Sequence, residues 1–439
     1  MKGLQKLISI ILVIGIIIGS LSACGKDTSK DNNADSNSSD TSKNNSDSSD
    51  DTKDDSNTSD EVVLEKYKIA VAFTQITAEQ LLQQDYLKNY IGPAFNVEFM
   101  FSEAIEDADL LMTFMENAYS SGCEGFMNFQ NTSIEQANAK ANELGMYIIT
   151  NTANYIENSD LPFSLGSLAT SVDSVADMYR DMVDKIVNDG NSHNVVIASA
   201  GAGLGNPQHY ESTVAILEGL RDLYGLTYDD EIANLASSRN QIEVSTGTDM
   251  KILIYPGYPN ADTFVSGMSA VLQTGEYDVL LACNQAYTQF SVAIDEVEKA
   301  YGFNIKVGAF TTVSDSARSS FTTIDSTGDT SLNSAVLKPS VVVAGGMFAV
   351  LYNGITGYSE NVRNNGRGDF FNTQMWLVNS AEEYEKLEKI NSSADTYELN
   401  VEEIKEMLCI YNPNANFQSI YENLDSVTAE GILNARGLN

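Results

Sequence analysis

Histidine and basic side chains are both scarce in this chain of 439 residues. Its only histidines are His193 and His209, which nearly excludes a metal or catalytic centre built from several histidines. Lysine and arginine together number 25, against 61 acidic residues, so the formal net charge at pH 7 is -36. A surface this acidic repels phosphate backbones and anionic lipid headgroups. We therefore expect no nucleic-acid partner.

Cysteine is also rare, and its four positions are Cys24, Cys123, Cys283 and Cys409. Cys123 and Cys283 lie in apolar, strand-like stretches and Cys409 lies in an apolar patch, so we expect buried thiols and no essential disulfide. The chain has no Ser-His-Asp order, no Cys-His pair and no metal-ligand spacing. Neither an enzyme nor a metal site is expected on these grounds.

One glycine-rich loop, Gly201–Gly205, follows a predicted strand and precedes a predicted helix, as a dinucleotide-binding loop does. It lacks the closing x-x-G of that motif, and an acidic residue downstream says little in so acidic a chain. We interpret it as a plain loop and expect no cofactor.

The N-terminal apolar run, Leu7–Gly19, is too short for a confident membrane span and follows the basic residues Lys2 and Lys6. The sequence Leu21-Ser22-Ala23-Cys24 comes directly after it and resembles the bacterial lipobox, in which the cysteine carries a lipid. We predict a lipoprotein signal peptide over residues 1–23 and lipidation of Cys24. The alternative is an ordinary secretory signal with a chance cysteine.

Residues 24–62 form a Ser/Asp/Asn/Lys segment without an aromatic residue. Such a composition cannot bury enough apolar surface to offset chain entropy, so we predict a disordered tether with a reach of about 30 Å. The protein is then held at the outer face of the cell membrane by its lipid.

From about Val62 onward, short apolar runs alternate with amphipathic helical patterns. This βα repetition predicts an α/β protein with parallel sheets flanked by helices, in two Rossmann-like lobes. The first set of predicted strands is Tyr67–Phe73, Asn96–Phe101, Gly125–Phe129, Met146–Thr150 and Phe163–Leu168. The second set is Asn194–Ser199, Lys251–Tyr255, Tyr277–Ala282, Ile305–Phe310 and Ser334–Leu337.

Several stretches occur in an order and spacing similar to those of the type I periplasmic-binding-protein family, the ribose- and galactose-binding-like receptors of ABC importers. They are YKIAVAF, GCEGFMNF, ELGMYIITNTAN, HNVVIASAGAGLGN followed by AILEGL, EYDVLLACNQA and NIKVGAFTT. The resemblance covers roughly residues 65–380. It implies two lobes that close on a ligand cleft between them, a permease partner in the membrane and a monomeric protein. A lipobox with a polar tether is the usual anchor of such receptors in Gram-positive bacteria.

The resemblance also implies three chain crossings at the hinge, near Gly166–Ala169, Ser334–Lys338 and Asn372–Leu377. The N-terminal lobe would then comprise residues 63–167 and 336–372. The C-terminal lobe would comprise residues 168–335 and 373–439, including a helical extension over 381–439 that we expect to pack on that lobe.

In this family the ligand meets the residues that follow the strands, because parallel sheets bind ligands at the carboxyl ends of their strands. The candidate ligand-binding residues are Phe73, Thr74, Gln75, Gln130, Asn131, Asn151, Thr152, Asn206, Tyr210, Tyr258, Asn284, Gln285, Tyr287, Thr311 and Lys338. Each also has a structural alternative: an amide caps a helix, a tyrosine packs in a core, and Lys338 is simply exposed.

The family's sugar receptors place charged groups at several of these tips, and this chain departs from them. Asn151-Thr152 stands where an Asp-Arg pair is common, and Asn284-Gln285 and Phe310-Thr311 each lack the acidic residue. Asn206–Gly219 contains no arginine. Amides, hydroxyls and tyrosines suit a neutral polar ligand, sugar-like or nucleoside-like. The sequence thus predicts an extracytoplasmic solute-binding lipoprotein of an ABC importer; a ligand sensor read by a membrane receptor or kinase is the alternative, and an exported enzyme a third, weaker one.

Overall fold

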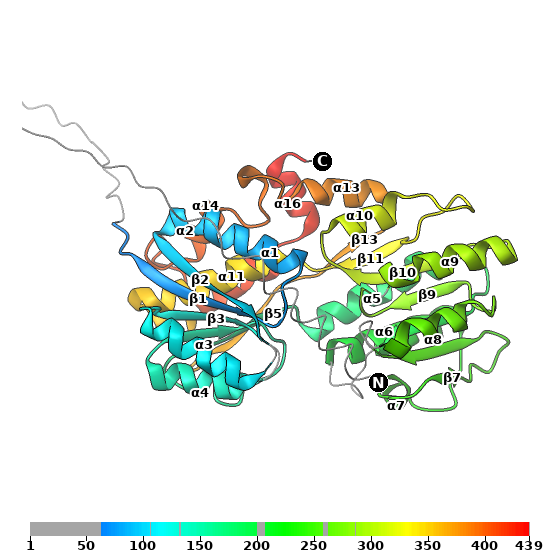
Figure 1. Ribbon diagram of the computed structural model, residues 1–439, viewed down its shortest axis with the longest axis horizontal. Coiled ribbons are helices and arrows are strands. Elements are labelled where there is room, and N and C mark those ends of the chain that lie inside the picture. The colour runs from blue at the N-terminus through cyan, green and yellow to red at the C-terminus, as the bar shows by residue number, and fades with distance from the viewer. Residues whose placement is uncertain are drawn as a thin grey trace, which may run out of the picture. The chain divides into compact units, whose positions relative to one another are not determined.

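The computed structural model describes residues 63–105, 107–130, 133–199, 207–257, 262–285 and 287–438. The predicted signal peptide, Cys24 and the tether lie outside the described residues. The described chain builds two separate sheets with helices packed against them (Figure 1). This confirms the predicted two-lobe α/β class.

The first sheet has six strands, all parallel, in the order β12-β5-β4-β3-β1-β2. Its strands are β1 (Tyr67–Phe73), β2 (Val97–Ala104), β3 (Gly125–Phe129), β4 (Tyr147–Thr150), β5 (Ser164–Ala169) and β12 (Asp369–Asn372). The last five residues of β1 and all of β3 and β5 are buried, as expected for apolar runs covered by helices on both faces. We call this sheet and the helices on it the N-terminal lobe: α1 (Ala78–Asp85), α2 (Gly92–Phe95), α3 (Ala108–Ser120), α4 (Ile134–Leu144), α11 (Ser340–Asn353) and α12 (Ser359–Val362).

The second sheet has seven strands in the order β13-β11-β10-β9-β6-β8-β7. They are β6 (Val195–Ser199), β7 (Ile242–Val244), β8 (Ile252–Pro256), β9 (Val279–Ala282), β10 (Lys306–Thr311), β11 (Ser334–Leu337) and β13 (Trp376–Val378). The five inner strands are parallel, whereas the edge strands β7 and β13 are antiparallel. The sequence did not predict the short edge strands β7, β12 and β13, which lie outside the βα repeat from which the other strands were predicted.

The C-terminal lobe consists of the second sheet and its helices. These are α5 (Val172–Val187), α6 (Pro207–Tyr224), α7 (Ile232–Ala236), α8 (Asp262–Leu272), α9 (Tyr287–Tyr301) and α10 (Asp315–Thr322). In α5 the Ser171 hydroxyl caps the helix by accepting a hydrogen bond from Ser174 N. Val175, Tyr179, Met182 and Val183 recur at helical spacing and are buried, so this face packs on the sheet.

Helix α11 is buried along its whole length. Gly345 and Gly346 allow close packing, because a Cβ atom at either would lie 2.7 Å from the Tyr86 hydroxyl or from Leu168 Cδ1, respectively. The segment Ser340–Val362 is long and apolar enough to cross a membrane, but 83% of its most apolar window is buried within the protein. It is accordingly a core helix of the N-terminal lobe.

Three short connectors join the lobes: Thr170–Ser171 between β5 and α5, Lys338–Pro339 between β11 and α11, and 373–375 between β12 and β13. The final residues of β5 and β12 are register partners, so the first and third connectors leave the N-terminal lobe side by side. Trp376, the first residue of β13, pairs with Leu337, the last residue of β11. All three connectors therefore run between the carboxyl edges of the two sheets and hold these edges close together.

The C-terminal segment forms α13 (Ala381–Lys389), α14 (Val401–Met407), α15 (Phe417–Asp425) and α16 (Ala429–Arg436). Helix α13 packs on α10 of the C-terminal lobe, with Tyr384 stacked on Phe321. Helices α14 and α15, however, pack on α11 and β12 of the N-terminal lobe. The expectation that the whole extension covers the C-terminal lobe is wrong for α14 and α15, because their buried apolar side chains join the core around α11.

Candidate functional site

The residues that follow β1 differ sharply in exposure. Phe73 is fully buried, with its ring stacked on Phe101 and Phe129 at centroid distances of 6.4 and 5.0 Å. Thr74 and Gln75 are exposed at the carboxyl edge of the sheet. Phe73 thus belongs to the core, while the two residues after it are accessible to a solute.

Gln130 ties three strand ends together instead of projecting outward. It is buried, its Nε2 donates to Ile105 O at 3.0 Å after β2, and its Oε1 accepts from the Thr74 hydroxyl at 3.1 Å after β1. Its own backbone N–H donates to Asn128 Oδ1 at 3.1 Å within β3. This side chain shapes the carboxyl edge by fixing where the exposed Thr74 stands.

The tip of β4 is also held by local hydrogen bonds. Asn151 is half-buried and its Nδ2 donates to Leu168 O in β5 at 2.7 Å. The Thr152 hydroxyl accepts from Asn154 N at 3.1 Å and closes a turn. Neither contact is the helix cap considered as the alternative for such tip residues, since Asn151 bonds to a neighbouring strand and Thr152 bonds within its own turn.

The C-terminal lobe brings Tyr287 and Thr311 together. The Tyr287 hydroxyl at the start of α9 lies 2.7 Å from Thr311 Oγ1 at the end of β10, and both residues are buried. Burial raises the pKa of the Tyr287 phenol, so it stays protonated. Asn284 is 8% exposed, whereas Gln285 is exposed beside it at the tip of β9.

Two further polar residues lie near the start of α6. Tyr210 is half-buried. Gln208, which the sequence analysis missed, donates from Nε2 to Thr170 O in the first connector at 3.2 Å. Burial lowers the pKa of the His209 imidazole to about 4, so this histidine is neutral at pH 7.

Lys338 in the second connector does not offer an unmatched charge. Its Nζ lies 2.9 Å from Oε1 of Glu79 in α1, and the two side chains are 21% and 14% exposed. The sequence analysis considered Lys338 as a partner for a ligand carboxylate or as an exposed lysine. It did not identify Glu79, because the pairing depends on the chain fold and not on sequence spacing.

Three candidates, Asn131, Asn206 and Tyr258, lie outside the described residues, as does the loop Gly201–Gly205. Of the candidates that the structure describes, Thr74, Gln75 and Gln285 are the exposed ones. All three carry uncharged donors and acceptors. Among the described residues no group of three histidine, cysteine or acidic side chains could hold a metal ion.

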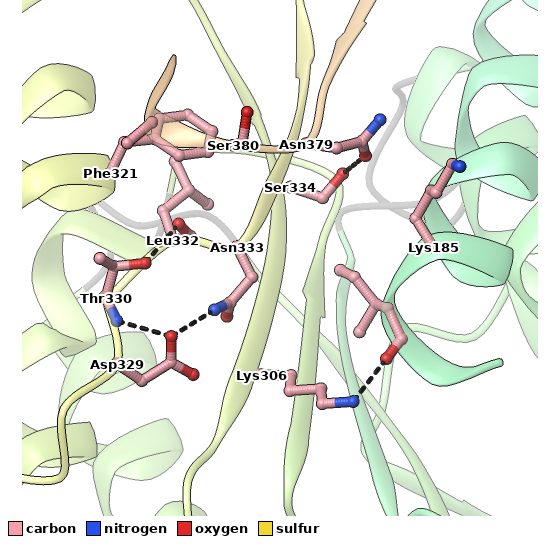
Figure 2. A pocket seen from close by; sticks show the side chains of 12 residues that line it. Lys185, Lys306, Phe321, Asp329, Thr330, Leu332, Asn333, Ser334, Asn379 and Ser380 are labelled. Carbon is pink, nitrogen blue, oxygen red and sulfur yellow. Dashed lines mark hydrogen bonds between the residues drawn. The ribbon is translucent and has the colours of Figure 1, made fainter. Parts of the chain in front are cut away.

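A pocket of about 410 Å³ lies at the opposite, amino edge of the second sheet (Figure 2). Its polar groups mostly bond to one another: Asp329 Oδ1 accepts from Thr330 N at 2.8 Å and from Asn333 Nδ2 at 3.0 Å, and the Ser334 hydroxyl donates to Asn379 Oδ1 at 2.8 Å. Strands β10 and β11 begin at this pocket, whereas the predicted site lies where the strands end. The pocket and the predicted site therefore lie at opposite edges of the sheet.

No protein-family model matches the sequence, and no curated protein matches it. Solved structures do match the fold. An ABC transporter solute-binding protein from Bacillus halodurans C-125 with bound myo-inositol has a TM-score of 0.52 and 16% identity, covering 74% of this chain and 98% of its own. A periplasmic solute-binding protein from Actinobacillus succinogenes 130z with bound D-allose has a TM-score of 0.53 and 13% identity, covering 73% and 99%.

A galactofuranose-binding protein is also similar, with a TM-score of 0.51, 10% identity and coverage of 74% of this chain and 98% of its own. These similarities confirm that the chain has the two-lobe fold of type I periplasmic binding proteins. At such low identity these similarities show the architecture and do not identify a ligand.

Proposed function

We propose that this protein is an extracytoplasmic solute-binding protein of an ABC importer, which captures a small polar solute when its lobes close. The observation that carries the proposal is the set of connectors, since three short crossings join the carboxyl edges of two separate sheets. A solute that contacts both edges favours the closed arrangement through those additional contacts. Capture of a solute in this way requires no covalent chemistry.

The proposed solute is neutral and polar, of the sugar, cyclitol or nucleoside class. Thr74, Gln75 and Gln285 offer uncharged donors and acceptors, the charge of Lys338 is matched by Glu79, and His209 is neutral. The similar solved proteins hold myo-inositol and D-allose, both neutral polyols. An anionic solute would need a cation that these tips do not supply.

The proposal includes an anchor and a partner. The lipobox-like Leu21–Cys24 and the polar residues 24–62 support lipid attachment at the outer face of the cell membrane. A tether of that length lets the protein, acting as a monomer, reach a permease in the same membrane. Mass spectrometry of the membrane fraction, with Cys24→Ser as the control, tests this attachment.

The test of the function is a thermal-shift screen of the purified protein with myo-inositol, aldohexoses, aldopentoses and nucleosides. A ligand that binds only the folded state stabilises it by about 2.7 kcal/mol at 100 times its dissociation constant. We expect at least one of these neutral solutes to raise the melting temperature by several degrees. If only charged solutes such as amino acids or sugar phosphates do so, the neutral-solute proposal is wrong.

Two variants locate the site. Gln75→Ala and Gln285→Ala remove one exposed amide from each lobe, whereas Gln273→Ala removes an exposed amide just after α8, at the amino edge. We expect the ligand-induced shift to fall in the first two and to persist in the third. A shift that persists in all three places the ligand elsewhere.

A further inference from the structure

The first and third connectors are bonded to each other. Ser171 N donates to Asn372 Oδ1 at 2.7 Å, and the hydroxyls of Thr170 and Thr373 lie 3.2 Å apart. Thr170, Asn372 and Thr373 are all buried. These two crossings therefore form one unit at the carboxyl edge of the first sheet, and whatever holds Asn372 also acts on Ser171.

A carboxylate from the C-terminal segment holds this unit. Asp425, the last residue of α15, accepts two hydrogen bonds through Oδ1, from Asn372 Nδ2 and from Gln374 Nε2 at 2.6 Å. Asn372 is the end of β12, and Gln374 lies inside the third connector. Asp425 thus links a residue of the N-terminal lobe to a residue that must turn if the lobes move.

A second acidic residue of the same segment holds the start of α11, the helix that follows the second connector. Glu398 is 2% exposed, and its Oε2 accepts from Val341 N at 2.8 Å and from Val342 N at 2.9 Å. Those N–H groups belong to the first turn of α11, directly after Lys338–Pro339, and have no partner within the helix, so Glu398 satisfies two of them even though burial raises the pKa of its carboxyl to about 7. Its Oε1 accepts from Asn391 Nδ2 at 2.7 Å, within the segment itself.

The C-terminal segment therefore bonds directly to the third crossing through Gln374, reaches the first crossing through Asn372, and holds the first turn of α11 just after the second crossing. This contact is not explained by core packing alone, because Asp425 accepts hydrogen bonds from two side-chain amides at a point where the chain passes between lobes. Hydrogen bonds to a charged acceptor are about twice as strong as neutral ones, and these two oppose rotation of Gln374 relative to Asn372.

We propose that the C-terminal segment is a hinge brace and that Asp425 is its positioning residue, setting how freely the lobes open and close. The inference rests on the proposed function in one respect only, the premise that the lobes move relative to each other. In this proposal the movement of the hinge is controlled by residues that are distant in the sequence from the strands whose ends would contact the ligand. Loss of the Asp425 carboxylate releases Gln374 and frees the third connector to rotate.

The test measures the distance between lobes by single-molecule energy transfer, without ligand. Labels are attached at Asn117→Cys on α3 and Glu296→Cys on α9, both exposed positions, in the full chain carrying Cys24→Ser. The native thiols Cys123 and Cys283 stay unlabelled, because burial raises their pKa to about 11 and about 12. Cys409 is buried as well.

We expect Asp425→Ala to broaden or shift the inter-lobe distance distribution, and Asp425→Asn, which keeps an acceptor oxygen, to restore much of the native distribution. The matched control is Glu422→Gln on the same helix, an exposed residue that bonds to Gln418 and touches no connector. An Asp425→Ala distribution identical to that of the native chain and of Glu422→Gln overturns the brace, whatever happens to the melting temperature.

The outcomes separate this inference from the proposed function. If a solute narrows the native distribution while Asp425→Ala leaves it unchanged, solute capture stands and the brace fails. If Asp425→Ala alters the distribution while every solute of the thermal-shift panel leaves both proteins unchanged, the brace stands and capture of a neutral solute fails. Circular dichroism of each variant confirms that a changed distance reflects a folded protein.

Discussion

The two edges of the sheets are built from different chemistry. At the amino edge, charged groups pair closely: Lys66 and Lys68 contact Glu98 beside the first sheet, and Lys306 contacts Asp189 beside the second. At the carboxyl edge the exposed candidate residues Thr74, Gln75 and Gln285 are uncharged, and the charged candidate, Lys338, is paired with Glu79. The amino edge thus carries ion pairs, whereas the candidate ligand-binding residues at the carboxyl edge are uncharged or paired within the protein.

The largest effect is expected where the hydrogen bonds of the buried His193 at the amino edge are broken. His193 is buried, with Nδ1 2.8 Å from Asp278 Oδ2 and Nε2 3.0 Å from Asp189 Oδ1. His193→Ala leaves the two carboxylates facing each other without the ring, so we expect the melting temperature to fall by about 5 °C. The solute-induced shift should persist, since the carboxyl edge is untouched.

The control for His193→Ala is Lys251→Ala at the same edge. Lys251 pairs with Glu276 at 2.9 Å, but the two side chains are 51% and 50% exposed. Exposed pairs contribute little, so a change of no more than about 2 °C is expected in thermal denaturation. If both variants lower the melting temperature by the same amount, the burial of His193 does not make its contacts more stabilising than an exposed ion pair.

A smaller effect, dependent on pH, is expected at Glu298 in the C-terminal lobe. Burial, with a smaller contribution from the nearby Asp325 and Asp329, raises the pKa of this carboxyl from its ordinary 4.5 to about 7, although the hydrogen bond from Ile305 N lowers it. A raised pKa in the folded state means that the contribution is fully present below pH 4.5 and is lost as pH rises through about 7.

We therefore expect the melting temperature to decline from pH 5 to pH 8, and Glu298→Gln, which cannot ionise, to show a flatter profile over that interval. Calorimetric scans at half-unit steps measure it. Glu296→Gln on the exposed face of α9 removes the same formal charge and should keep the native slope. Equal slopes in all three proteins would show that Glu298 is not the titrating group.

At the carboxyl edge the effects should appear in binding and not in stability. Gln75→Ala should change the free energy of unfolding of the ligand-free protein by no more than about 0.5 kcal/mol, because the side chain is exposed. Loss of one hydrogen bond to the solute, about 1 kcal/mol, should weaken binding about fivefold in isothermal titration. Gln273→Ala should bind with native affinity.

Much of the fold could be predicted from sequence, because the buried strands are continuous apolar runs and the helices between them are amphipathic. The short edge strands β7, β12 and β13 could not, since they lie outside the repeated βα units that revealed the four-residue strands β4, β9 and β11. The site was harder for another reason. A polar residue at a strand tip has the same spacing whether it meets a solute or, like Gln130, bonds to Ile105 and Thr74.

The contacts of the C-terminal segment were beyond sequence reasoning for a related reason. Glu398 and Asp425 are two acidic residues among 61, and only the fold shows that they accept hydrogen bonds beside the connectors. Lys338 was identified as a candidate from its position after β11, but its partner Glu79 is 259 positions earlier in the chain, and no local pattern pairs them.

A small stability effect is expected at this Lys338–Glu79 pair, and it tests whether the two edges differ in charge. Both side chains are partly exposed, at 21% and 14%, so replacing Lys338 by Met should change stability by only about 1 kcal/mol. If the Lys338 charge does not contact the solute, a neutral solute should bind Lys338→Met with an affinity within about threefold of native. Raising the salt concentration should then change this affinity little. The double variant Lys338→Met with Glu79→Gln removes the charge left behind by the single change, and should bind like the native protein. A loss of more than tenfold in both variants would mean that the lysine reaches the solute, and the carboxyl edge would then differ from the amino edge in accessibility but not in charge.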